Sequence, residues 1–234
     1  MKKLLSFGFV LVILSGCHTA SGQDQLLDEL TITPPSFHNS HYDNLNALLG
    51  ASIEYPAMAR KCGIQGTELI RFAISPSGEI EDITVCNSVS REIDEAVISV
   101  LLFTNGKWQP GTIDGEPTTM VREVNIAFVL HSFETMVEKG KNYMLQANNL
   151  MYIREKPGRA LHFYNKAATL FPNNTSVLLA RSLCLEKLGR DAEAEKDNER
   201  LKLLAVKGNS ITAPHNGAIA LDDRLITDLV VMAK

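Results

Sequence analysis

Histidine and cysteine are the residue types whose spacing in this 234-residue chain first suggests chemistry. His38 and His41 have the H-x-x-H spacing of some metal ligands. No third ligand lies near them, and in a polar segment two solvated histidines are the expected interpretation. The chain carries no Walker loop, G-x-G-x-x-G, G-x-S-x-G or H-E-x-x-H motif. We therefore expect no enzyme activity, no cofactor and no metal.

Three cysteines could take part in disulfide chemistry if the protein is exported, because export reaches compartments that permit such bonds. Cys62 and Cys86 are the candidate pair. Strand alternation through Val85 argues against the bond, since it turns Cys86 to the opposite face of its strand. Both possibilities stay open at this point. Cys184 lies on the apolar side of a helical pattern and is expected in a core.

A fourth cysteine, Cys17, ends an apolar run near the N-terminus. Lys2 and Lys3 precede about eleven apolar residues, a length typical of a signal peptide and shorter than the ~20 residues of a membrane span. The sequence Leu14-Ser15-Gly16-Cys17 resembles a bacterial lipobox, in which the cysteine is lipidated after cleavage. We predict a signal peptide over 1–16 and lipid attachment at Cys17. The alternative is an ordinary signal with an incidental cysteine.

The composition restricts the classes of partner. The net charge is −4, with 45% hydrophobic and 21% charged residues, which is ordinary for a globular protein. A mildly acidic chain lacks the electrostatic footprint of a nucleic-acid-binding protein, so we expect no nucleic-acid partner. Residues 17–46 are polar, have no sustained period and contain Pro34-Pro35. This pattern predicts a flexible tether between the lipid and the first domain.

Residues 47–131 change period often, in pieces of strand or helix length. The expected elements are a short helix from Pro56 to Lys61, a hairpin of Thr67–Ile74 with a strand through Ile83 and Val85, a helix capped by Ser90, and a last strand Val121–Leu130. We expect Trp108 to pack at the exit of the second helix. This order predicts a three-stranded antiparallel sheet with two helices on one face.

Several landmarks in this region occur in a fixed order. They are YPAMARKCGIQG from Tyr55, V-x-N-S at 85–88, EIDEAV at 92–97, KWQPG at 107–111, DGEP at 114–117, and the strand through Phe128. Together they resemble the C-terminal domain of TonB. The resemblance implies an α+β domain that captures the TonB box of outer-membrane receptors by adding it as a strand.

A strand at a sheet edge offers unpaired backbone groups that can accept an extended peptide. The resemblance assigns that role to Arg122, Glu123, Val124, Asn125, Ile126, Ala127, Phe128 and Val129. The alternative is that the polar side chains of this strand protect the edge from pairing.

The resemblance also exposes a difference. TonB has an inner-membrane helix and a long proline-rich span driven by the ExbB–ExbD motor, and we expect neither here. His18 follows the predicted lipidated cysteine, whereas aspartate there is associated with inner-membrane retention in enteric bacteria. The periplasmic side of the outer membrane is therefore favoured.

A helical period begins near Phe133, and residues 134–207 resemble tetratricopeptide repeats. The expected core positions are Met144, Ala147, Met151, Ala160, Tyr164 and Ala167. Lys196 and Glu199 replace apolar residues in the second unit, which predicts a solvent-facing terminal helix. A plain pair of helical hairpins is the alternative. Within the tail, 208–234, the residues Leu221, Leu225, Ile226, Leu229 and Val230 predict a capping helix.

These observations predict an α+β fold: a TonB-like domain followed by an all-α region. The expected function is a periplasm-facing lipoprotein that binds receptor TonB-box segments during transport across the outer membrane, with a further protein partner for the helices. The alternative is an envelope scaffold or adaptor that acts through those helices without binding receptors.

Overall fold

The computed structural model describes residues 31–39, 41–207 and 229–233. Its strands are β1 (Ile32–Thr33), β2 (Ser36–Phe37), β3 (Gly66–Ile74), β4 (Ile80–Asn87), β5 (Trp108–Gln109), β6 (Gly111–Ile113), β7 (Glu116–Thr118), β8 (Met120–Val129) and β9 (Leu229–Ala233). Its helices are α1 (Leu45–Ser52), α2 (Ala57–Lys61), α3 (Arg91–Phe103), α4 (Phe133–Asn148), the π-helical η1 (Asn149–Ile153), α5 (Pro157–Leu170), α6 (Thr175–Lys187) and α7 (Asp191–Lys207).

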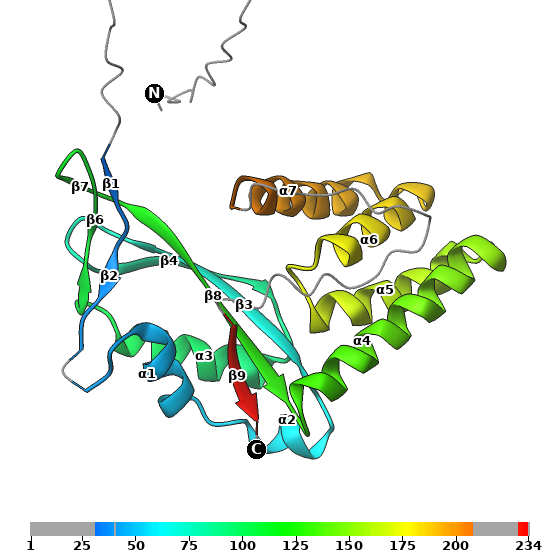
Figure 1. The fold of residues 1–234 in the computed structure, drawn as a ribbon, viewed down its shortest axis with the longest axis horizontal. Helices are drawn as coiled ribbons and strands as arrows, with labels where there is room; N and C mark the ends of the chain where they lie inside the picture. Colours follow the sequence, from blue (N-terminus) through cyan, green and yellow to red (C-terminus); the bar gives the residue numbers. More distant parts are fainter. Residues whose placement is uncertain (1–30, 40, 208–228, 234) are drawn as a thin grey trace, which may run out of the picture. The chain divides into compact units, whose positions relative to one another are not determined.

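The central sheet has four strands in the order β4-β3-β8-β9 (Figure 1). β3 pairs antiparallel with both β4 and β8, as the alternating patterns predict. β9 then pairs with β8 in parallel. Helices α4 to α7 follow as a separate run, which confirms the α+β class.

The first face of the sheet carries the main hydrophobic core. Ile70, Phe72 and Ile74 alternate along β3 and are fully buried. They share this core with the α3 stripe of Ile93, Val97 and Leu101. The Ser90 side chain accepts a hydrogen bond from the backbone N–H of Ile93 and caps α3, as its sequence position predicts. Burial of each large apolar side chain stabilises the fold by about 1.5–3 kcal/mol.

Trp108 lies at the end of α3, as expected. Its indole N–H donates to the Thr104 hydroxyl at 3.0 Å, and its ring packs against Phe72 at a centroid distance of 5.7 Å. The ring of Phe37 also packs against the indole, at a centroid distance of 5.5 Å. The hydrogen bond satisfies a polar group that burial would otherwise leave unpaired.

The predicted tether is wrong over its described part. β1 pairs with β6 and β2 pairs with β5, both antiparallel, and α1 already begins at Leu45. Phe37 is buried in the main core. These residues therefore belong to the domain, because two backbone pairings and one aromatic side chain hold them against it.

The second face of the sheet is also covered, so the expectation of helices on one face only is incomplete. Ala127 and Val129 of β8 form a small core with Met136 of α4 and Leu170 of α5. The Thr67 hydroxyl donates to the Leu170 carbonyl at 2.6 Å. The first helical hairpin therefore packs directly on the sheet.

Helices α4 to α7 form two successive helical hairpins (Figure 1). All six predicted core residues of the first hairpin are buried together with the Cys184 thiol. Tyr164 donates to the Asn148 side-chain oxygen at 2.8 Å, so the small alanines and one satisfied tyrosine fill the space between α4 and α5. Lys196 and Glu199 of α7 are exposed, as expected.

The predicted capping helix of the tail is wrong for its described part. Leu229–Ala233 is a strand, and Met232 is buried in the main core. Leu221, Leu225 and Ile226 lie outside the described residues. Five consecutive residues that include two valines favour a strand when an edge is available to pair with them.

Candidate peptide-binding edge

The candidate site is built on β8, which pairs with β3 along its length from Met120↔Ile74 to Phe128↔Gly66. Val124, Ile126 and Phe128 alternate into the main core and fix which side of the strand faces the helices α1 and α3. The ring of Phe128 also meets Tyr55 edge-on at 5.4 Å. The predicted binding strand is therefore a central strand of the domain, with one face in its main core.

The outer edge of β8 is occupied in the structure, which corrects the expectation of an unpaired edge. β9 pairs with it in parallel, in a register that runs from Asn125↔Leu229 to Val129↔Ala233. Met120–Val124 lies outside that register. The correction has a simple cause: the pairing joins residues about a hundred positions apart, and no local pattern predicts such a contact.

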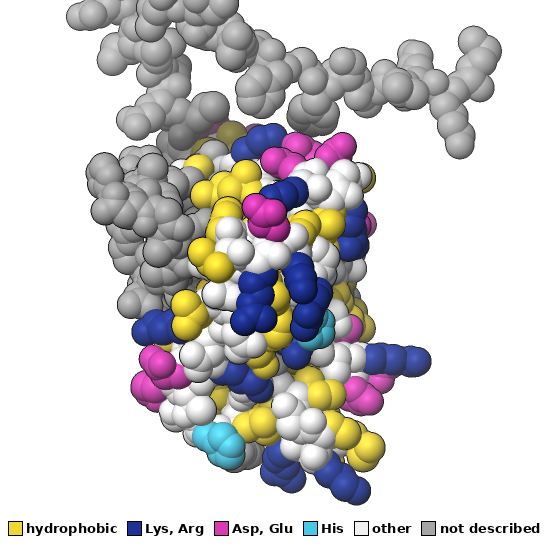
Figure 2. All heavy atoms as spheres, turned by 90° about the vertical axis from the view of Figure 1, so that its right-hand side faces the viewer, with side chains coloured by type: hydrophobic (Ala, Val, Ile, Leu, Met, Phe, Trp, Pro, Cys, Tyr) yellow, Lys and Arg dark blue, Asp and Glu magenta, His cyan; other side chains and the backbone are white. Residues whose placement is uncertain are grey.

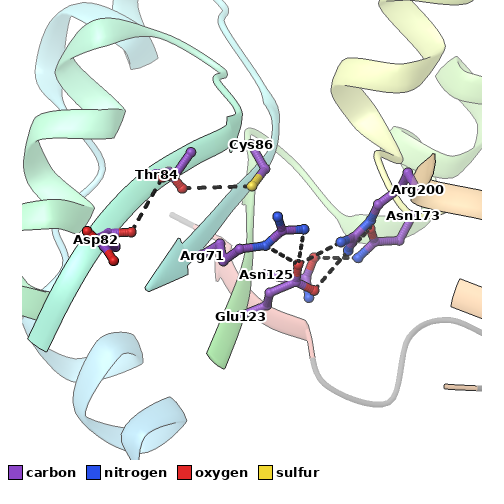
Figure 3. Close-up of polar contacts among 8 residues, drawn as sticks. All are labelled: Arg71, Asp82, Thr84, Cys86, Glu123, Asn125, Asn173 and Arg200. Atoms are coloured by element: carbon purple, nitrogen blue, oxygen red, sulfur yellow. Dashed lines mark hydrogen bonds and ion pairs between the residues drawn. The ribbon is translucent and has the colours of Figure 1, made fainter. Parts of the chain in front are cut away.

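Two polar side chains of β8, Glu123 and Asn125, do not face open solvent, whereas Arg122 is half-buried. Glu123 accepts from Arg71 at 3.0 Å and from Arg200 at 2.6 Å, and its side chain is only 8% exposed. Asn125 accepts from Asn173 at 2.7 Å. Figure 3 shows these side chains converging from β3, β8, α7 and the loop before α6. They connect the sheet to the helices, a role that strand alternation alone could not reveal.

Arg200 is the centre of this connection. Its guanidinium reaches both oxygens of Glu123 and the side-chain oxygen of Asn173, and its side chain is 12% exposed. One carboxylate is thus shared by two guanidinium groups, Arg71 and Arg200. Charge-assisted bonds of this kind are shorter and stronger than neutral ones.

A cavity of about 370 Å³ lies beside this cluster, between the sheet and the last helices. Its charged lining includes Arg71, Arg181, Arg200 and Asp197. Arg181 is already bonded to Asp197 through two nitrogens. Because these arginines are engaged within the protein, the cavity is best understood as part of the junction between sheet and helices.

Glu68 is a buried carboxyl near the start of β3 that the sequence analysis missed. Its Oε2 accepts from the Val89 backbone N–H at 3.0 Å, whereas Oε1 has no hydrogen-bond partner. The pKa of Glu68 is raised to about 8: burial is the largest cause, the hydrogen bond from Val89 acts against it, and the Asp94 carboxylate adds to it. The sequence did carry a signal for this site, because Glu68 stands at the same spacing of two as the buried residues Ile70 and Phe72.

The structure decides the predicted disulfide but does not describe the predicted lipidated cysteine. Cys62 and Cys86 are free thiols, so the candidate disulfide is not formed. Cys62 follows α2, whose Ala59 belongs to the main core, whereas Cys86 of β4 lines the cavity beside Arg71. Cys17 lies outside the described residues. In the described ranges, no group of three His, Cys, Asp or Glu could hold a metal.

The order of the elements and the position of β8 now allow comparison with known proteins. Residues 51–130 match the family model of the Gram-negative bacterial TonB protein C-terminal. The match covers about a third of the chain and ends at the residue after β8. No curated protein and no solved structure matches the chain.

The TonB C-terminal match indicates a TonB-like role in envelope transport. The family consists of non-enzymatic energy-transducing proteins whose C-terminal domains interact with outer-membrane receptors. Across the part of the chain that the structure describes, none of the helices has the length and apolar character needed to cross a bilayer.

Proposed function

We propose that this chain is an envelope lipoprotein, anchored through Cys17 on the periplasmic side of the outer membrane. Its TonB-like domain binds an extended segment of an outer-membrane receptor along β8, in exchange for β9. The observation that carries the proposal is the parallel pairing of Asn125–Val129 with β9, because a receptor segment could take the same place on this edge. Main-chain hydrogen bonds would supply the affinity.

The exchange requires that β9 can be displaced. β9 has five residues, whereas β8 pairs with β3 over nine positions, so the outer pairing is the shorter of the two. Met232 of β9 inserts into the core and is the described side chain that holds the strand in place. A receptor segment that carries an apolar residue at the same register would replace that contact.

The test is a titration of the unit that contains all described elements, Thr31–Lys234, with TonB-box peptides, read by backbone amide shifts. Met232→Asp should loosen β9 and strengthen peptide binding about tenfold, since the competing strand no longer fills the site. Met232→Leu keeps an apolar side chain of similar volume and serves as the control. Shifts are expected along Asn125–Val129.

The occupied edge also supports a second candidate, an envelope scaffold that acts through its helices without receptor binding. If neither the parent nor Met232→Asp shows shifts at millimolar peptide, while both keep the β3–β8 amide pattern of the folded sheet, receptor capture is excluded. The scaffold role would then be the better account. Shifts confined to the helices would likewise exclude capture along β8 and favour the scaffold.

A further inference from the structure

The far end of the helical region exposes large apolar side chains. This end is made by the end of α4, by η1 and the start of α5, and by the α6–α7 loop; we call it the helical tip. Leu145 is 69% exposed, Tyr152 49% and Ile153 75%. Leu145 lies in the last turn of α4, and Tyr152 and Ile153 are adjacent in η1, which follows α4 directly. Exposed apolar side chains that gather in one place indicate an interaction surface.

Cationic side chains surround these residues. Arg154, Lys156 and Arg159 follow Ile153 directly and are exposed, as are Lys187 and Arg190 of the α6–α7 loop. The cations around the start of α5 and those of the α6–α7 loop are neighbours in space. The Cys184 thiol of α6 donates to the Pro157 carbonyl at 3.3 Å, and Lys187 and Arg190 are near enough to lower the pKa of the same thiol. Figure 2, which views this side, shows Lys and Arg side chains gathered near the middle with hydrophobic side chains beside them.

Helix stability does not explain this placement of charge. Cations at the N-terminus of α5 oppose its helix dipole, the first turn of α5 has no acidic residue, and its N-cap Lys156 makes no side-chain capping bond. Arg190 is bonded to Glu193, and Glu155 and Glu186 add negative charge nearby. Arg154, Lys156, Arg159 and Lys187 have no ion pair among the bridges of the described residues, so the helical tip is positive on a protein of net charge −4.

We propose that the helical tip binds the surface of an anionic phospholipid membrane. Tyrosine and an aliphatic side chain next to lysine and arginine suit the boundary between headgroups and acyl chains. Ile153 would enter the acyl region, Tyr152 would lie at headgroup level and the cations would meet lipid phosphates. A lipid surface is favoured because exposed apolar side chains surrounded by cations match the boundary between acyl chains and anionic headgroups.

The test is co-sedimentation of the Thr31–Lys234 unit, which carries no lipid, with phosphatidylglycerol-containing vesicles and with neutral phosphatidylcholine vesicles. Binding to the anionic vesicles alone is expected, and it should weaken as salt rises. Arg154→Glu with Lys156→Glu should reduce binding at least about 25-fold, since the loss of each cation removes a factor of about five and the two glutamates add repulsion. Ile153→Asp should also weaken it.

The matched control is Arg60→Glu with Lys61→Glu on α2, which changes net charge equally at exposed positions away from the helical tip. This control should lose much less binding than the tip variant. An equal loss of vesicle binding in the tip variant and in the control would show that only net charge matters, and it would overturn the proposal. Failure of the parent to bind anionic vesicles would also overturn it, and a protein partner would then be the occupant to test.

Discussion

At the scale of single residues, Glu68 carries the clearest consequence for stability. It is fully buried, and its raised pKa of about 8 means that the folded protein keeps a proton which the unfolded chain loses near 4.5. Between these two values the folded state binds more protons than the unfolded state. The free energy of unfolding therefore falls as pH rises through this window and levels off above about 8.

Glu68→Gln should remove this dependence. The difference in unfolding free energy between the variant and the parent should shift in favour of the variant by roughly 2–4 kcal/mol from pH 5 to pH 9, because the parent must bury a charge at the higher pH. Urea denaturation at both pH values measures the difference. Glu92→Gln, at an exposed position, is the control and should change little. A parallel response of parent and Glu68→Gln to pH would refute the assignment.

Gly78 tests backbone conformation at the same scale. Its φ of +81° is the left-handed region, and a Cβ there would collide with the Trp108 carbonyl oxygen. Gly78→Ala should lower stability by about 2–4 kcal/mol. Gly158→Ala is the control, since it lies in α5 with open space around it and should be neutral or stabilising by up to ~1 kcal/mol. Thermal unfolding compares the two, and equal effects would contradict the argument.

At the scale of elements, the shared carboxylate of Glu123 connects α7 to the sheet. Arg200→Ala should cost about 1–3 kcal/mol, because it removes charge-assisted bonds from a nearly buried group. It should also increase hydrogen exchange in α7. Lys202→Ala provides the comparison: its bridge to Glu195 is exposed on both sides and is worth less than ~1 kcal/mol. A larger loss for Lys202→Ala would show that the Arg200 cluster does not hold the helices.

The elements differ in how far the sequence predicts them. Alternation over Thr67–Ile74 and Val121–Leu130 and the Ser90 cap predicted the hairpin, α3 and β8, because these signals are local. β1 and β2 have two residues each, too few to show a period. β9 and the Glu123–Arg200 contact depend on pairings between distant residues, and a short apolar run fits a helix or a strand equally well. The prediction of β8 as a strand is confirmed, whereas the prediction that its outer edge is unpaired is wrong.

At the scale of the whole molecule, the predicted lipid on Cys17 and the helical tip give two separate attachments to a membrane. In cells, Cys17→Ala should move the protein from the detergent-extracted membrane fraction to the fraction released by a high-salt wash, since two or more acyl chains anchor stably and a cationic surface does not. Immunoblots of the fractions measure the shift. Cys62→Ala is the control. Salt-resistant membrane association of Cys17→Ala would show that the anchor lies elsewhere.

The parallel pairing of β9 with β8 has a consequence for kinetics. If β9 must leave before another strand can enter, the observed association rate of a peptide cannot increase without limit as its concentration rises. It should reach a plateau equal to the rate at which β9 departs, whatever the peptide. Receptor segments of different sequence would then differ in how long they stay bound while sharing one maximal rate of capture, set by the five residues Leu229–Ala233.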